Sequence, residues 1–209
     1  ALPEAALHTT LAEPSVLVPA LREKSIHTTW MQRLPKPGRL YRHYFMLYPF
    51  AVETADLRDY DLVVSSCFGY AKGIHTRPDA VHVCYCYTPM RWVWRHDDYV
   101  GREHFGALQR TAIACAMPLL RRWDLRAARR PDHFLTSSQV VAERIRSCYR
   151  RDATVIPPPV EVSRFRATDP VGDYYLIVSR LSAYKRLDLA VAACTALGRR
   201  LIVIGDGPD

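Results

Sequence analysis

The sequence predicts an α/β protein with two Rossmann-like domains, each built on a parallel sheet, and three observations lead to this class. Short apolar runs alternate with segments of helical periodicity along the whole chain, which is the pattern of βαβ units. Three consecutive prolines, at positions 157–159, interrupt this alternation and indicate a stiff connection. Hydrophobic residues make up 49% of the 209 residues, enough for a packed core.

The proline run divides the chain into a first domain at residues 1–156, a linker at 157–170 and a second domain at 171–209. The last part holds two strand patterns and one helix pattern. A parallel sheet needs more than two strands and cover on both faces. We therefore expect the second domain to be present only as its first βαβ unit, so that the chain is an internal fragment.

The first domain opens on residues 1–19, which are weakly patterned. Residues 34–38 contain two prolines and a glycine and predict a turn. Aromatic and apolar side chains crowd residues 41–56, which predict a helix interrupted at Pro49.

Two buried strands are expected next, at residues 60–66 and 80–86. Each strand leads into a loop at the carboxyl edge of the sheet, where ligands of open α/β sheets bind. The second of these loops, residues 87–94, carries Tyr87, two tryptophans and Arg91. Aromatic faces and a cation suit a sugar and its phosphate, although a packed aromatic corner has the same composition.

Residues 102–130 predict a long helix, kinked near Pro118. The helix is basic, and its arginines are Arg110, Arg121, Arg122, Arg126, Arg129 and Arg130. Such a face is either solvated or, beside the apolar Ile113, Met117, Leu119 and Leu120, rests on an anionic membrane surface. No nucleic-acid recognition motif accompanies the charge, so nucleic acid is not an expected partner.

The first domain ends with a strand at residues 133–137, a helix at 140–149 and a strand at 153–156. Ser138 and the serine before it stand where they could cap the helix through a side-chain oxygen. The prolines at 157–159 stop the last strand.

The second domain begins with an apolar run, Tyr174–Val178, the pattern of a strand buried on both faces. Leu187, Ala190, Val191, Cys194 and Leu197 then recur at helical spacing, and Gly198 follows where a helix C-terminus is expected. Residues 201–204 predict a second buried strand, parallel to the first, and residues 205–208 a turn.

Two cations lie at the carboxyl end of the first strand of this domain. Arg180 leaves the strand at that point, and Lys185 lies near the N-terminus of the helix, which itself favours anions. Together they suit a diphosphate. The same spacing would also be found if Arg180 and Lys185 were only solvated charges of a loop.

The charge and cysteine content narrow the class of partner. The net charge of +8 favours anionic partners such as nucleotide diphosphates, lipid headgroups or nucleic acid. The six cysteines form no C-x-x-C pair and mostly lie in apolar context, which indicates core residues of a reduced cytosolic protein and no metal site. No apolar run approaches the roughly 20 residues of a membrane span.

Several long segments resemble glycosyltransferase family 4, whose members have the two-domain GT-B fold. They occur in the same order as in the family and cover residues 57–66, 85–94, 156–160, 179–188 and 203–208. They are most similar to a branch of bacterial mannosyltransferases of O-antigen and exopolysaccharide assembly, of the WbaZ type.

This resemblance implies a retaining transfer of a hexose, mannose, from GDP-mannose or a similar nucleotide sugar to a lipid-linked or polysaccharide acceptor. No metal or other cofactor is implied, and the location would be cytoplasmic, at the inner face of the membrane. In the family the Arg and Lys hold the diphosphate, which implies a catalytic role for Arg180 and Lys185. The implied substrate-binding residues are Tyr87, Arg91, Ser138, Gly205, Asp206 and Gly207.

Three departures from the family pattern matter. A Gly-rich loop that follows the first strand in the family is absent, and so is a Glu-x7-Glu motif of the donor domain. Tyr87 stands where the branch usually has His, and a tyrosine cannot carry a proton near neutral pH as a histidine can. The 209-residue chain alone is therefore expected to lack transferase activity.

Three other functions remain open on the sequence. A non-catalytic sugar-nucleotide binding module is favoured by Tyr87 in place of His. A binder of anionic surfaces or of nucleic acid is favoured by the net charge. A dinucleotide enzyme is suggested by Gly205-Asp206-Gly207, but no G-x-G-x-x-G follows a first strand.

Overall fold

The computed structural model describes residues 4–41, 43–95, 107–166, 172–182 and 185–207. The chain divides into two compact units, residues 1–94 with 111–158 and residues 95–110 with 159–209. Three parts of the sequence prediction lie outside the described residues: the start of the helix at 102–106, the linker at 167–170 and Pro208.

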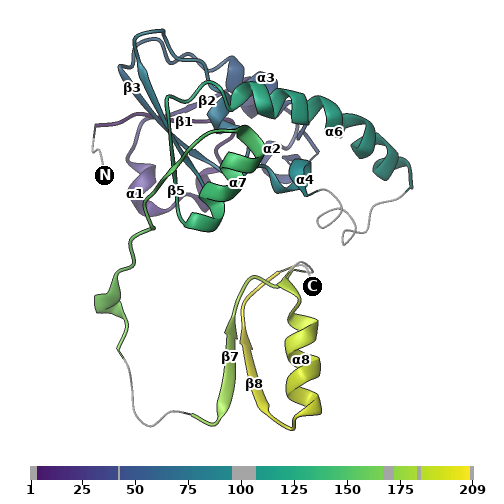
Figure 1. The fold of residues 1–209 in the computed structure, drawn as a ribbon. Coiled ribbons are helices and arrows are strands. Elements are labelled where there is room, and N and C mark those ends of the chain that lie inside the picture. Colours follow the sequence, from purple (N-terminus) through teal and green to yellow (C-terminus); the bar gives the residue numbers. More distant parts are fainter. Residues whose placement is uncertain (1–3, 42, 96–106, 167–171, 183–184, 208–209) are drawn as a thin grey trace. The chain divides into compact units, whose positions relative to one another are not determined.

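Four parallel strands form the central sheet of the first unit, in the order β3–β4–β5–β6 (Figure 1). Their bounds are β3 Leu62–Cys67, β4 Val81–Cys86, β5 His133–Thr136 and β6 Thr154–Val155. The prediction of an α/β class with a parallel sheet is confirmed. All strand ends therefore point the same way, and the loops after β3, β4 and β5 meet at one carboxyl edge.

Helices connect the strands of this sheet (Figure 1). The α-helices of the first part are α1 Pro19–Arg22, α2 Pro37–Leu40, α3 Tyr48–Glu53, α4 Arg91–Trp94, α6 Ala107–Ala127 and α7 Gln139–Tyr149. Short 3-10 helices lie at Pro14–Val16, Trp30–Arg33, Ala71–Gly73 and Val162–Arg164.

The start of the chain differs from its prediction in two ways. Residues 1–19 contain a strand, β1 Leu7–Thr9, which pairs in parallel with β2 Ile26–Thr28. The predicted helix over 41–56 is confirmed only for α3, Tyr48–Glu53, which is shorter at both ends. Pro49 falls in its first turn, where the missing N–H costs nothing and the fixed φ favours the helix, so this proline starts a helix and does not interrupt one.

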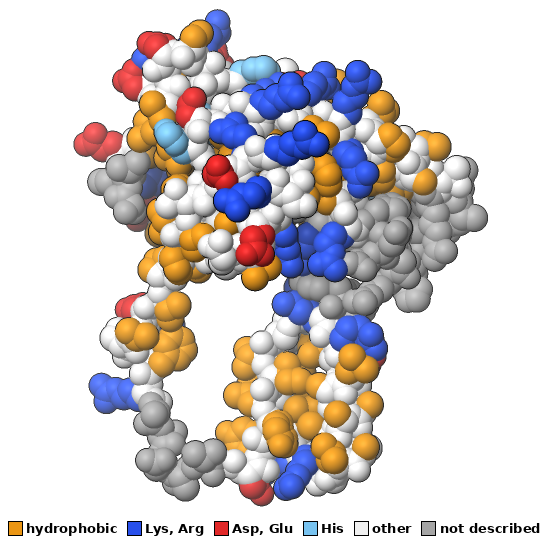
Figure 2. Space-filling model, viewed as in Figure 1, with side chains coloured by type: hydrophobic (Ala, Val, Ile, Leu, Met, Phe, Trp, Pro, Cys, Tyr) orange, Lys and Arg blue, Asp and Glu red, His pale blue; other side chains and the backbone are white. Residues whose placement is uncertain are grey.

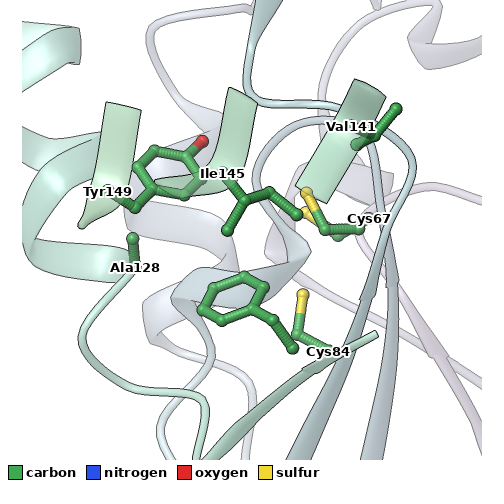
Figure 3. Close-up of a cluster of buried hydrophobic side chains, with 8 residues drawn as sticks. Cys67, Cys84, Ala128, Val141, Ile145 and Tyr149 are labelled. Atoms are coloured by element: carbon green, nitrogen blue, oxygen red, sulfur yellow. The ribbon is translucent and has the colours of Figure 1, made fainter. Parts of the chain in front are cut away.

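The central sheet is covered on one face. Side chains that point to that face, such as Ser65, Cys67, Cys84, Cys86 and Phe134, are buried. α7 packs on them through Val141, Ile145 and Tyr149, as Figure 3 shows for several of these side chains. Cys84 and Cys86, two residues apart on β4, thus share the covered face of their strand.

The opposite face of the sheet is more open, which corrects the prediction that β3 is fully buried. Leu62 and Val64 of β3 and Val81 of β4 are exposed. On that side of β3, no helix of the described residues contributes side chains to the buried clusters. The strand therefore alternates between exposed and buried side chains.

The second unit contains a βαβ unit, as predicted. β7 Tyr174–Val178, α8 Leu187–Ala196 and β8 Arg200–Ile204 follow one another, and β7 pairs with β8 in parallel (Figure 1). Gly198, with φ of 60°, follows the end of α8 in the left-handed conformation that glycine adopts most readily. The expected burial of both strands is wrong. In the described part of this unit α8 is the α-helix that lies beside them, and one helix can cover only one face of a sheet.

Candidate functional site

The carboxyl edge of the first unit brings Tyr87 and Ser138 to the ends of neighbouring strands. Tyr87 follows β4 and is 46% exposed, and its hydroxyl accepts a hydrogen bond from Ser66 Oγ at 3.3 Å. Ser138 follows β5 and caps α7, since its Oγ accepts from the backbone N–H of Val141 at 3.4 Å. The predicted helix cap is thus confirmed, and the hydroxyl of Ser138 is already engaged in it.

The loop at 87–94 is partly an open surface and partly a packed corner. Arg91 begins α4 and is exposed, whereas Met90 and Val93 are buried and join the core. Trp94 is half-buried, and its indole N–H donates to Asp124 Oδ2 at 2.7 Å. Tyr87 and Arg91 are therefore exposed at this edge, while Trp94 serves the packing.

Phe68 is an exposed aromatic residue that the sequence analysis did not single out. It follows β3 directly, is 64% exposed, and meets Trp92 edge-to-face with ring centroids 6.2 Å apart. Trp92 in turn packs on Gly69, where an added Cβ would lie 3.3 Å from the indole ring. Because β3 and β4 are neighbours, Phe68 and Tyr87 present two exposed rings on the same edge. The signal in the sequence that could have identified Phe68 is its position directly after a strand.

A buried ion pair between Lys72 and Asp124 lies behind this edge. Both side chains are at most 1% exposed. Lys72 Nζ also donates to the carbonyl of Gly69 at 2.6 Å, and Asp124 Oδ2 accepts from Trp94 and, at 2.8 Å, from the Tyr149 hydroxyl. The pair therefore ties the loop after β3 to the loop after β4, through α6 and α7.

The protonation states of this network follow from burial and charge. Burial alone would lower the pKa of Lys72, but the Asp124 carboxylate outweighs it and the pKa is raised, so the side chain stays an ammonium. Burial and then the charge of Asp124 raise the pKa of Tyr149, which stays a hydrogen-bond donor. A hydrogen bond from Cys84, helped by the Lys72 ammonium, lowers the pKa of the Cys67 thiol.

The sequence held one signal for this network. Asp124 is the one acidic residue in a 21-residue helix rich in arginine, and it follows a tryptophan. A lone carboxylate on the apolar side of a basic helix needs a partner, because an unpaired buried charge is very costly. Lys72 gave no comparable signal, since it stands in a short 3-10 helix, Ala71–Gly73, that shows no apolar periodicity.

Ser65 and His82 form a second buried polar contact, with Ser65 Oγ 2.9 Å from His82 Nε2. Asp132 accepts from the backbone N–H of His82 at 2.7 Å and not from its ring. Burial lowers the pKa of His82 to about 4, so the ring is neutral near pH 7. Although Ser, His and Asp occur together, Ser65 and His82 are buried within the sheet and Asp132 does not contact the His82 ring, so the relay of a hydrolase triad is lacking.

In the second unit the loops after β7 and β8 run side by side. Backbone hydrogen bonds join Ser179 N–H to Ile204 O and Leu181 N–H to Asp206 O, each at 3.0 Å. A Cβ at Gly205 or Gly207 would collide with the carbonyl oxygens of Ser179 and Leu181. The glycines are therefore required for this close approach, which extends the pairing past both strands.

Arg180 lies within this paired stretch and is exposed. Lys185 is also exposed, and its backbone N–H donates to Ser182 O at 2.8 Å, two residues before α8 begins at Leu187. Asp206 is engaged locally, since its Oδ1 accepts from Gly207 N–H at 2.8 Å. The structure thus places Arg180 beside Gly205–Gly207 at the carboxyl edge of β7 and β8, and Lys185 just ahead of α8.

No further ligand group emerges from the described side chains. Within residues 4–207, apart from the gaps already named, no three His, Cys, Asp or Glu side chains are arranged to hold a metal ion. In the same residues no helix has the length and apolar character needed to cross a membrane.

Comparisons with models of protein families, with curated proteins and with solved structures each found no match to this chain. What the protein does must therefore be argued from its own residues.

Proposed function

We propose that this chain belongs to a retaining glycosyltransferase with a GT-B fold, which transfers a hexose from a nucleotide diphosphate sugar to a lipid-linked or polysaccharide acceptor. The donor is proposed as GDP-mannose. In this proposal the first unit contacts the acceptor, the βαβ unit of β7, α8 and β8 binds the donor, and the enzyme works in the cytoplasm at the inner face of the membrane.

The observation that carries the proposal is the arrangement after β7 and β8. An exposed arginine stands next to a turn whose glycines let the loops after β7 and β8 approach closely, and an exposed lysine lies just ahead of α8. Backbone N–H groups, a helix N-terminus and two cations at the carboxyl edge of parallel strands are the features that bind phosphate groups in α/β proteins.

The chemistry asked of these residues is electrostatic. As the bond between the sugar and the diphosphate lengthens, negative charge grows on the leaving diphosphate. Arg180 and Lys185 would stabilise that charge where it develops, which lowers the barrier of the transfer step. Arg180 can grip two phosphate oxygens with its planar guanidinium, whereas Lys185 acts as a point charge. This division of roles needs no metal.

Tyr87 and Arg91 are proposed to contact the transferred sugar or the acceptor. Both are exposed at the carboxyl edge of the first unit. Tyr87 offers a hydroxyl and a ring face, which suit a sugar, but no proton transfer near neutral pH. Because Tyr87 cannot transfer a proton near neutral pH, it also favours a second candidate function. This is a non-catalytic module that binds nucleotide sugars without turning them over.

Turnover separates the two candidates. The full-length protein, incubated with GDP-mannose, a lipid-linked glycan acceptor and a metal chelator, is expected to release GDP and to extend the acceptor. Free mannose should not replace the nucleotide sugar. Saturable binding of GDP-mannose without release of GDP would favour the non-catalytic module, and the absence of both would contradict the proposal.

A further inference from the structure

One side of α6 combines exposed arginines with exposed apolar residues. Within α6, Leu119, Arg122 and Arg126 follow one another at spacings of three and four, and Leu125 lies beside them, so these four residues share one side. Arg129 follows in the turn just beyond Ala127, where α6 ends. All five are exposed. We call them the α6 face. In Figure 2 blue side chains gather, among orange ones, over the part of the surface where Figure 1 places α6 and α7.

The α6 face carries positive charge that the described part of the protein does not neutralise. Asp124, the one acidic residue between positions 107 and 127, is fully buried and paired with Lys72. Arg122, Arg126 and Arg129 form no ion pair with any described residue. Three adjacent cations without counter-charges attract an anionic partner.

The apolar part of the α6 face is small but strongly exposed. Leu119 is 64% and Leu125 39% exposed. This corrects the apolar set expected from the sequence, because Leu120 is buried in the core and Met117 packs against it. Core packing therefore accounts for Leu120 and Met117 but not for Leu119.

We propose that the α6 face binds the interface of an anionic membrane. Arginines would contact lipid phosphates while Leu119 and Leu125 enter the boundary between headgroups and acyl chains, as on helices that lie in the membrane plane. A nucleic acid would use the same cations but would not need an exposed leucine between them. The proposal does not depend on glycosyl transfer, because it rests on charge and exposure alone.

The test is sedimentation of the protein with vesicles of phosphatidylcholine and phosphatidylglycerol in equal parts. Replacing Arg122, Arg126 and Arg129 with glutamine is expected to weaken binding by about 100-fold, since each basic residue near an anionic leaflet contributes about fivefold. Leu119→Gln should weaken it by about fivefold or more. Because all four side chains are exposed, thermal unfolding should change little in either variant.

A matched control removes the same charge elsewhere. Arg33, Arg39 and Arg164 are exposed, and replacing all three with glutamine is expected to lower binding far less than the α6 variant. Equal losses in both triple variants would overturn the assignment to this face. Failure of the wild-type protein to bind anionic vesicles at low salt would overturn the proposal itself. Binding to single-stranded DNA that ignores Leu119→Gln, with weak vesicle binding, would identify a nucleic-acid surface instead.

Discussion

The variant Asp124→Asn is expected to lower the free energy of unfolding by about 3–5 kcal/mol, the usual effect of removing one partner of a buried ion pair. The asparagine oxygen can still accept hydrogen bonds from Trp94 and Tyr149. The Lys72 ammonium, in contrast, would stand in the interior without a counter-charge. The loss would therefore come from the unpaired charge, together with the acceptor that Lys72 loses when Oδ1 becomes an amide NH2, and not from a cavity.

Urea unfolding of three variants isolates the effect of the unpaired charge. In the double variant Lys72→Met/Asp124→Asn no charge is left unpaired, so much of the lost stability should return. Asp152→Asn is the control, because Asp152 pairs with Arg146 at 2.8 Å on the surface and should cost less than about 1 kcal/mol. Equal and small losses for Asp124→Asn and Asp152→Asn would show that the buried pair does not hold the two loops.

The second large effect is expected on turnover. If the protein carries out the proposed transfer, Arg180→Ala and Lys185→Ala should each lower kcat by about 10²–10³-fold, because losing one contact to developing charge typically costs about 2.7–4 kcal/mol. Thermal stability should barely change, since both side chains are exposed. Arg180→Lys should also be impaired, because lysine lacks the planar fork of arginine.

Arg199 provides the control for this experiment. It is exposed in the same unit but lies just before β8, at the opposite end of the strands from Arg180. Arg199→Ala removes the same charge and should leave kcat unchanged. If the variants at positions 180 and 185 also retain near-normal rates while folding normally, both side chains are solvated charges and the diphosphate site lies elsewhere.

Local patterns in the sequence predicted much of the fold. Helical spacing and Gly198 defined α8, and Ser138 marked the start of α7, because each of these signals acts over a few residues. Strands β1 and β2 escaped detection because three residues are too few to show alternation. Pro49 was assigned the wrong role, since a proline in the first turn and a proline that breaks a helix differ only in what precedes them.

Burial could not be predicted to the same degree. An apolar run indicates a strand, but whether a strand such as β7 is covered depends on which elements pack on it. The same limit applies to the α6 face, where Leu119 and Leu120 are adjacent in sequence but Leu119 is exposed and Leu120 is buried. The pairing of Lys72 with Asp124 joins residues 52 positions apart, and no spacing rule predicts such a contact.

For the candidate site, the sequence located the positions but not their arrangement. Arg180 and Gly205–Gly207 were each identified from short motifs. Their proximity follows from the parallel pairing of β7 with β8 and from the two backbone hydrogen bonds that extend it. Phe68 was missed because a single aromatic residue in a loop carries no motif.

Backbone amide NMR spectra of the protein, recorded while GDP-mannose is added, test the central claim most directly. The donor-site assignment predicts saturable shifts at Arg180, Lys185 and Gly205–Gly207 that are also produced by GDP, are not produced by mannose, and disappear in Arg180→Ala but persist in Arg199→Ala. Shifts confined to other residues, or no saturable change with either nucleotide, would contradict the assignment of this edge as a nucleotide-sugar site.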